Sequence, residues 1–474
     1  MKNLKNLLYI IPLGLAVSCA PEFEDEITFT NGQADFTTYV AVGNSLTAGF
    51  QSSALRKVRQ ENSFPAILAA QFAEVGGGAF KQPLLADGVG IGSSLNAELK
   101  LAYTTDCKGK TSIGPVPSAA AGQADQFSPT TYIGANGPYN NVGVPGAKTY
   151  HLVASGYGNP ANIAAGLANP FYARFANPAN YDESVAAAVA RTKPTFFTMW
   201  IGANDVLGYG LQGGEEGSDV ITATATFNAT YNMTLDSLLK SGAKGVLANI
   251  PNITSVPYFN VISRNGLELD ANQAAQLNAA YAPYNSGIDA AVAGSLITPE
   301  QGNRRKISFT AGANRWVITD DKLNSIPGLP KSRQMRHNEH LIMVTPQDSL
   351  KCAGWGSSKG IPSNYVLTSD EVTKINTATN EFNNVIKTAA SKHNLGFLDA
   401  NKLMAEMESG LTYNGVTYSA DFVTGGAFSL DGFHPSTRGY AIIANEFIDV
   451  INDKYGAKVR KIDPNSYEGI LFPN

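Results

Sequence analysis

Four short apolar runs, each ending at a turn, are the feature that most restricts the fold of this chain. They read TTYVAVGNS near Tyr39, PTFFTMWIGAND near Phe196, AKGVLANIPN near Val246 and LGFLDANKL near Phe397. None of them alternates polar with apolar residues, which is typical of parallel strands that are buried on both faces. We therefore predict a mostly parallel sheet built from these four runs.

Amphipathic helical patterns lie between and after the runs. Thr368 to Glu371 has the form of a capping box, and apolar residues follow it at helical spacing: Val372, Ile375, Phe382, Val385, Ile386 and Ala389. Near the C-terminus, Ser436 or Thr437 is the predicted cap of a second helix, with Tyr440, Ile443, Phe447 and Val450 on one face. Strands that alternate with such helices predict a layered α/β fold.

Two long stretches interrupt this alternation. Residues from about 76 to 140 and from about 261 to 363 are rich in Gly, Ala, Asn and Pro. We interpret them as insertions over one rim of the sheet, because structureless connections of this length are uncommon inside a compact domain.

Composition excludes some classes of partner. The 474 residues are 43% hydrophobic, enough for a large core, and the formal net charge is −4, from 35 basic and 39 acidic side chains. No basic stripe is present, so neither nucleic acid nor an anionic membrane face is predicted as a partner. A neutral substrate fits this charge better.

The first residues have the form of a targeting segment. Two lysines, at positions 2 and 5, precede the apolar stretch 7–17, which is too short to span a bilayer, and small residues stand just before Cys19. This arrangement resembles a bacterial lipobox, which implies a signal peptide over 1–18 and acylation of Cys19. The polar segment 19–34 is interpreted as a tether, and its acidic run resembles the export signal of Bacteroidetes surface lipoproteins. The expected location is the bacterial cell envelope, with a lipid anchor in the outer membrane; a plain secretory signal is the alternative.

Export bears on the two remaining cysteines, Cys107 and Cys352. In an oxidising compartment a disulfide between them would persist, but spacing alone fixes no geometry. The sequence does not decide whether this disulfide forms, and we favour two free thiols over the disulfide.

The first apolar run ends in a turn that contains a serine. Gly43 to Gly49 reads GNSLTAG, and a serine on a tight turn between strand and helix, here Ser45, holds its hydroxyl out at the sheet edge. The following helix N-terminus brings unpaired N–H groups near developing negative charge. A phosphate loop is disfavoured because Phe50, not lysine, follows Gly49. A serine that serves only the turn is the alternative.

A serine nucleophile needs a base, and the chain has five histidines: His151, His337, His340, His393 and His434. His434 stands out in the sequence DGFHP, with Asp431 three residues before it and Pro435 directly after it. This spacing can bring the carboxylate to the imidazole Nδ1 while Nε2 faces the serine. We therefore predict Asp431 and His434 as the partners of Ser45.

Two further turns carry candidate donors for a substrate oxyanion. Asn204 follows a predicted buried strand in the turn GAND, and Gly146 lies in NNVGVPGAKTY, where the missing Cβ lets a backbone N–H approach a ligand. Either residue could also serve only its turn.

These four stretches, GNSLTAG, GVPGAKT, GAND and DGFHP, occur in the order found in the SGNH hydrolases, also called GDSL esterases and lipases, and the chain resembles that family from about residue 35 to 453. The resemblance implies that Ser45 is the nucleophile and that Asp431 and His434 complete the triad. It implies an oxyanion hole made by Gly146, Asn204 and the N–H of Ser45. It also implies a three-layer α/β/α sandwich of flavodoxin-like type, with no metal or organic cofactor, over a single hydrolase domain at 35–474 that carries the two insertions.

One residue departs from the family pattern: Asn44 stands where the family name records aspartate. Since the triad carboxylate comes from Asp431, the implied mechanism is unaffected. The expected function is that of an exported serine esterase acting on carboxylic esters through an acyl-enzyme. Its substrate would be a small-molecule or glycan-linked ester, with acetyl or short acyl groups or a lipid as the acyl part, and the lipid anchor would be its contact with the membrane.

Two other classes of function were weighed. His337 and His340 in RHNEH have a spacing that could bind a metal on a helix, but no third ligand flanks them and neighbouring basic residues oppose a cation. The other is a non-catalytic surface lipoprotein that binds glycans or a partner on the same fold. The oligomeric state has no signature in the sequence.

Overall fold

The structure is a computed structural model, and it describes residues 28–92, 96–120, 122–123, 132–215, 217 and 219–473. The predicted signal peptide and Cys19 lie outside these residues. In the part that is described, no helix is both long enough and apolar enough to cross a membrane.

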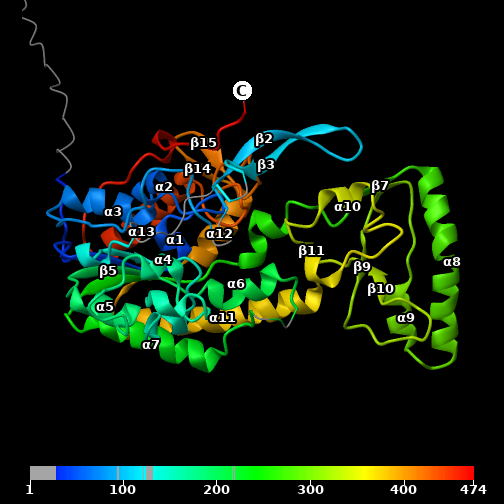
Figure 1. Cartoon of the computed structure of the whole chain (residues 1–474), viewed down its shortest axis with the longest axis horizontal. Helices are drawn as coiled ribbons and strands as arrows, with labels where there is room; N and C mark the ends of the chain where they lie inside the picture. Colours follow the sequence, from blue (N-terminus) through cyan, green and yellow to red (C-terminus); the bar gives the residue numbers. More distant parts are fainter. Residues whose placement is uncertain are drawn as a thin grey trace, which may run out of the picture.

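A five-stranded parallel sheet lies inside the larger part of the molecule, at the left of Figure 1. Its strand order is β13-β6-β5-β1-β4, with bounds Gly396–Leu398, Lys244–Ala248, Phe196–Trp200, Tyr39–Gly43 and Asn141–Gly143. All four neighbouring pairs are parallel. The four apolar runs are therefore strands of one sheet, as predicted. β4 was not predicted, because three residues ending in glycine give no periodicity to detect.

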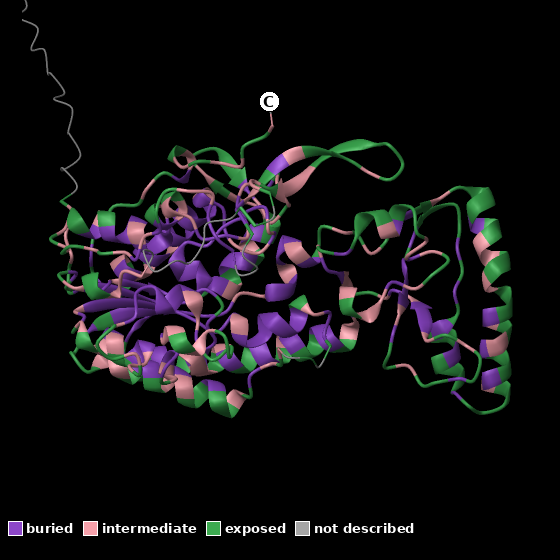
Figure 2. Cartoon of the chain, viewed as in Figure 1, coloured by how far each residue is buried: buried purple, intermediate pink, exposed green. Residues whose placement is uncertain are grey.

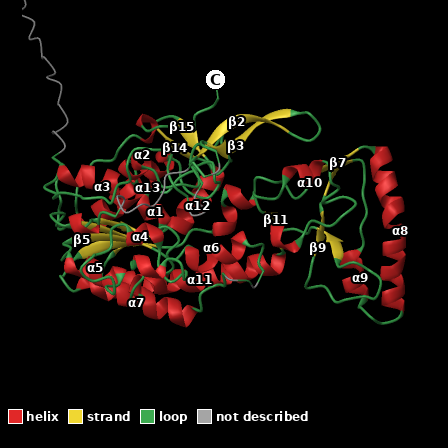
Figure 3. Cartoon of the chain, in the orientation of Figure 1, coloured by secondary structure: helices red, strands yellow, loops and turns green. Residues whose placement is uncertain are grey.

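Helices cover both faces of this sheet (Figure 3), which confirms the predicted α/β/α sandwich. α3 (Phe64–Ala73) and α13 (Thr437–Tyr455) pack together on one face, and α5 (Val185–Arg191), α7 (Thr224–Leu239) and α11 (Ser369–Lys392) lie on the other. Figure 2 shows the buried residues concentrated in and around the sheet. The hydrophobic core joins side chains from the sheet and from both helical layers.

The two helices predicted from the sequence form with the predicted caps. Thr368 and Glu371 make the capping box of α11, with the Thr368 N–H donating to Glu371 Oε2 at 2.8 Å. Ser436 caps α13 by accepting from the Gly439 N–H at 3.0 Å. Most of the predicted apolar stripes are buried; Val385 and Val450 are partly buried against the same core.

Shorter elements surround the sandwich. These are α1 (Ser45–Ala48), α2 (Lys57–Glu61), α4 (Pro170–Ala173), α6 (Asn204–Leu211), α12 (Ala400–Ser409), and the hairpin of β14 (Leu411–Tyr413) with β15 (Val416–Tyr418). α1, α6 and α12 each follow a strand of the central sheet, so their first residues lie at its carboxyl edge.

The second predicted insertion forms a lobe beside the sandwich, seen at the right of Figure 1. The lobe has its own hydrophobic core, with buried residues between Leu267 and Val366. Its elements are β7 (Leu267–Leu269), α8 (Ala271–Ala293), α9 (Pro299–Arg305), β8 (Gly312–Asn314), β9 (Val317–Thr319), β10 (Ser332–Gln334), β11 (His340–Leu341), α10 (Gln347–Lys351) and β12 (Val366–Leu367). The 23-residue helix α8 was missed, because it buries few residues and contains Pro283. The division of the chain into one hydrolase domain with insertions stays a prediction.

The first predicted insertion contains a long hairpin of β2 (Leu99–Thr105) and β3 (Thr111–Pro117). Its tip is joined to the lobe by a disulfide between Cys107 and Cys352. Our preference for free thiols was wrong, because the fold brings the tip of the hairpin to the end of α10, a proximity that spacing in the sequence does not encode. An ion pair of Asp106 with Lys351 at 3.0 Å lies beside the disulfide.

Candidate active site

Ser45 stands two residues beyond the end of β1 and is the first residue of α1. Asn44 caps this short helix, its Oδ1 accepting from the Leu46 N–H at 3.0 Å. The turn also needs a glycine before it, because a Cβ on Gly43 would lie 2.3 Å from the carbonyl oxygen of Trp200. The amide at position 44 thus supplies the N-cap for which asparagine and aspartate are equally suited.

His434 and Asp431 lie on the loop that leads into α13. His434 Nε2 is 2.8 Å from Ser45 Oγ, and His434 Nδ1 is 2.9 Å from Asp431 Oδ2. The structure therefore brings the three predicted residues into one continuous hydrogen-bonded chain, although 389 positions separate Ser45 from His434. Ser45 is 7% exposed, so the serine end of the three hydrogen-bonded residues is sheltered from solvent.

The carboxylate of Asp431 is held by its surroundings as well as by His434. Its Oδ1 accepts from the N–H groups of Phe433 and His434 at 2.9 and 2.8 Å, and its Oδ2 accepts from the Ser53 N–H at 2.7 Å. Burial alone would raise the pKa of Asp431, but the charge of His434 and these hydrogen bonds lower the pKa to about 2. The side chain is therefore ionised at neutral pH and can orient the imidazole.

The serines that support this loop were not predicted. Ser52 N–H donates to Ser429 Oγ at 2.9 Å, and Leu430 N–H donates to Ser52 Oγ at 3.3 Å. These contacts join the turn after α1 to the loop that carries Asp431. The sequence offers no sign of them, since they pair segments more than 370 positions apart.

Gly146 and Asn204 lie on the two sides of the serine turn. Gly146 follows β4, and Asn204 begins α6 just after β5; β4 and β5 are the two neighbours of β1 in the sheet. Gly146 has φ +79°, a conformation that favours glycine. Asn204 Nδ2 donates to the carbonyl oxygen of Ala147 at 2.9 Å, so the two candidate oxyanion donors belong to one hydrogen-bonded unit.

Asp205, which was not predicted as a site residue, belongs to the same unit. It is fully buried, and its Oδ2 and Oδ1 accept from the Thr149 N–H at 3.0 Å and the Thr149 Oγ1–H at 2.8 Å. Burial raises the pKa of Asp205 to about 6, against the lowering effect of the hydrogen bonds from Thr149. Its carboxylate therefore fixes the turn that carries Gly146 to the helix that carries Asn204. The sequence feature that could have indicated Asp205 is its position as the last residue of the GAND turn.

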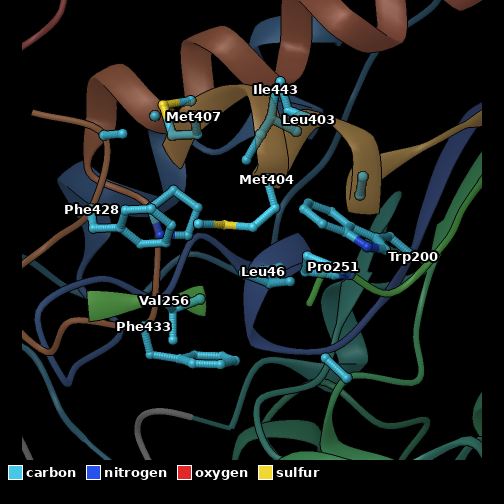
Figure 4. Close-up of a pocket in the computed structure, with 15 residues that line it drawn as sticks. Leu46, Trp200, Pro251, Val256, Leu403, Met404, Met407, Phe428, Phe433 and Ile443 are labelled. Carbon is cyan, nitrogen blue, oxygen red and sulfur yellow. The ribbon is translucent and has the colours of Figure 1, made fainter. Parts of the chain in front are cut away.

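An apolar pocket of about 70 Å³ has a lining that includes chain neighbours of Ser45 and His434 but not these two residues themselves (Figure 4). Leu46, Phe433 and Pro435, which are chain neighbours of Ser45 and His434, line it. The remaining wall comes from the ends of the central strands and from α12 and α13: Trp200, Ala203, Pro251, Val256, Ala400, Leu403, Met404, Met407, Ala427, Phe428, Gly439 and Ile443. These side chains offer contact to hydrocarbon and almost no hydrogen-bonding groups.

The other histidines lie away from this chain of hydrogen bonds. His340 Nδ1 lies 3.0 Å from the carbonyl oxygen of Phe259, and His337 is exposed in the lobe. His151 stacks on Tyr157, and burial together with Lys148 lowers its pKa to about 4. Within the described ranges, no cluster of three or more His, Cys, Asp or Glu side chains could hold a metal ion.

Comparison with known proteins adds to this geometry. The family model described as GDSL-like Lipase/Acylhydrolase matches residues 320–447, a range that includes Asp431 and His434. This part of the chain is therefore similar to a GDSL-like lipase/acylhydrolase domain. A solved structure of the lipase/acylhydrolase from Enterococcus faecalis is similar over 90% of this chain and 98% of that chain, at 13% identity and a TM-score of 0.31. The search of curated proteins gave no match.

The match over residues 320–447 supports, at the level of the family, an ester hydrolase of the esterase or lipase type. The matched range begins in the lobe and ends in α13, so Ser45 lies outside it. Ser45 joins the matched part through its hydrogen bond to His434.

Proposed function

We propose that this GDSL-like hydrolase cleaves carboxylic esters by covalent catalysis at Ser45. The observation that carries the proposal is the unbroken hydrogen-bonded chain from Ser45 Oγ through His434 to Asp431. A serine hydroxyl is a weak nucleophile, and an adjacent oriented base is the arrangement that activates it.

The proposed reaction has two halves. His434 Nε2 takes the proton of Ser45 as Oγ attacks the ester carbonyl, and it then gives this proton to the departing alcohol. This leaves an acyl group on Ser45 Oγ. Water, deprotonated by the same imidazole, attacks the acyl-enzyme, and the imidazolium returns the proton to Ser45 Oγ as its bond to the acyl carbon breaks and the acid is released. Asp431, with a pKa of about 2, stays ionised throughout and stabilises the imidazolium.

The negative oxygen formed in each half requires hydrogen-bond donors. We assign this role to the N–H groups of Ser45 and Gly146 and to the side-chain amide of Asn204. The positions of β4 and β5 on the two sides of β1 support the assignment, because they place both candidate turns beside the serine. Loss of one donor typically costs about 10²–10³ in kcat.

The apolar pocket favours an ester whose acyl part is a hydrocarbon chain. Leu46 directly follows the nucleophile Ser45 in the chain, and Phe433 directly precedes the base His434. Both line the pocket. A chain of several methylenes would bury there at about 0.8 kcal/mol per methylene, whereas an acetyl group would leave most of the pocket unused. We therefore propose acyl groups longer than acetyl as the preferred substrates.

Hydrolysis of p-nitrophenyl esters from acetate to palmitate, by the protein without residues 1–19, tests this function. Ser45→Ala and His434→Ala should each lower kcat by about 10⁴-fold or more. Ser391→Ala and His337→Ala change exposed residues of the same types and should retain activity. Full activity of Ser45→Ala would refute the assignment. Absence of turnover with every ester, in protein shown to be folded, would favour a non-catalytic binding protein.

We also propose that Cys19 carries a lipid anchor that holds the enzyme at the bacterial cell envelope. The lysines at positions 2 and 5, the short apolar stretch and the small residues before Cys19 support this proposal. Metabolic labelling with radioactive palmitate should label the protein, and Cys19→Ala should abolish the label. Equal labelling of both would exclude acylation at this cysteine.

A further inference from the structure

The lobe contains a polar pocket of about 240 Å³ that none of the proposed chemistry uses. It lies between α9, the turn 320–324, β10 with the residues after it, and the first turn of α11. Five basic side chains line it: Arg304, Arg305, Lys322, Arg333 and Arg336. Some of these basic side chains already form ion pairs with carboxylates, and the others do not.

Three of the five are paired. Arg333 is held by two carboxylates, with its Nη1 and Nη2 at 2.8 and 2.7 Å from Glu339 and its Nε 2.7 Å from Asp320. Lys322 pairs with Glu371, and Arg304 pairs with Glu300. Glu339 also accepts from the backbone N–H groups of Arg336 and Ser369 at 2.6 and 3.3 Å.

Arg305 is not paired in this way. It is 2% exposed, its Nη2 donates to the carbonyl oxygen of Asn324 at 2.8 Å, and its Nε has no hydrogen-bond partner among the described residues. No described carboxylate lies within ion-pair distance of it. A buried charge without a counter-ion is strongly unfavourable, so a guanidinium in this state calls for an anion.

Arg336 is the second unpaired cation of the pocket. It is half-buried, and its guanidinium has no ion pair or hydrogen bond with any residue that the structure describes. Burial and the charges of Arg333 and Arg304 lower the pKa of Arg336, against the raising effect of Glu339 and Asp320. An anion bound between Arg305 and Arg336 would supply the counter-charge that both guanidinium groups lack.

The start of α11 adds a favourable field to the pocket. Thr368, Ser369 and Asp370 line the pocket at the positive N-terminal end of the 24-residue helix α11. Glu339 Oε1 already accepts there from the Ser369 N–H and Oγ–H at 3.3 and 3.2 Å. Asp370, the remaining acidic group of the lining, is exposed at the rim.

We propose that this pocket binds a tetrahedral oxyanion, the phosphate or sulfate group of a ligand. The unpaired guanidinium donors reach it from two elements, α9 and the segment after β10, and a tetrahedral oxyanion presents acceptors in several directions, whereas a carboxylate presents two oxygens in one plane. The volume leaves room for the organic group that carries the oxyanion. The proposal does not depend on ester hydrolysis.

Calorimetric titration of the full chain in detergent tests the proposal, with inorganic phosphate, inorganic sulfate and acetate as separate probes. We expect one site per chain for phosphate or sulfate, and at least tenfold weaker binding of acetate. Whichever of phosphate and sulfate binds more tightly identifies the oxyanion that the pocket prefers. No binding of either, or acetate binding as tightly, would overturn the proposal.

Variants locate the site. Arg336→Gln should weaken phosphate or sulfate binding at least tenfold, and Arg336→Lys should restore part of the loss. Arg315→Gln, at an exposed arginine of the same lobe, is the matched control and should bind like the parent. Since Arg305 is buried, Arg305→Gln is informative only with an unchanged circular dichroism spectrum, and the Arg336 pair decides the outcome without it. Equal affinity of Arg336→Gln and the parent would refute the site.

Discussion

Asp205→Asn should stabilise the protein while it slows the reaction. The carboxylate is fully buried, and burial raises its pKa from the ordinary 3.8 to about 6. The folded state therefore holds this proton more tightly than the unfolded chain does, and the free energy of unfolding falls as the pH rises from about 4 to 6. At 1.36 kcal/mol per pH unit, the difference between 3.8 and about 6 costs about 3 kcal/mol above pH 6.

Asparagine removes this cost because it resembles the protonated acid in shape and charge. Relative to the parent, Asp205→Asn should gain about 3 kcal/mol at pH 8 and about 1.5 kcal/mol at pH 5, less any weakening of the two hydrogen bonds from Thr149. The turn with Gly146 would be held less firmly, so kcat at pH 8 should fall, by less than the about 10²–10³-fold expected for loss of a whole donor.

Urea unfolding at pH 5 and pH 8, with ester turnover measured beside it, checks both parts. Asp236→Asn changes an exposed aspartate of α7 and serves as the control, with no pH-dependent gain expected. If Asp205→Asn were destabilised by the same amount at both pH values, the argument from burial would be wrong. An unchanged kcat would show that this carboxylate does not position the turn.

Three further predictions concern single contacts. Asn44→Ala should cost about 1 kcal/mol of unfolding free energy and lower kcat, because the Leu46 N–H loses its cap, while Asn44→Asp should keep both; thermal unfolding and turnover check this. Replacing Cys107 and Cys352 by serine should lower stability by about 2–5 kcal/mol in urea unfolding, and an unchanged midpoint would argue against the bond. Ala427→Leu fills part of the apolar pocket and should lower kcat/KM for octanoate at least tenfold relative to acetate; an equal fall for both esters would place the acyl chain elsewhere.

The sequence by itself determined four of the five strands of the central sheet and named most residues of the candidate site. Buried parallel strands are short continuous apolar runs, a pattern local enough to read directly, and the turn after each run names the residues at the carboxyl edge. Asp431 and His434 were recognisable together because three positions in one loop are enough to pair a carboxylate with an imidazole. That Ser45 meets them was an expectation drawn from motif order, and the hydrogen bond that joins them depends on how α13 packs against the sheet.

Only the tertiary structure decided the features that join distant segments. The disulfide between Cys107 and Cys352, the support of Asp431 by Ser53, and the clamp of Asp205 on Thr149 each link parts of the chain between 56 and 378 positions apart. Burial is also decided by the fold: Arg305 and Arg336 are ordinary basic residues in the sequence, and the described part of the structure gives their guanidinium groups no carboxylate partner. Local patterns report what a segment does with its own neighbours, whereas a pKa, a cavity or an unpaired charge belongs to the assembled surroundings.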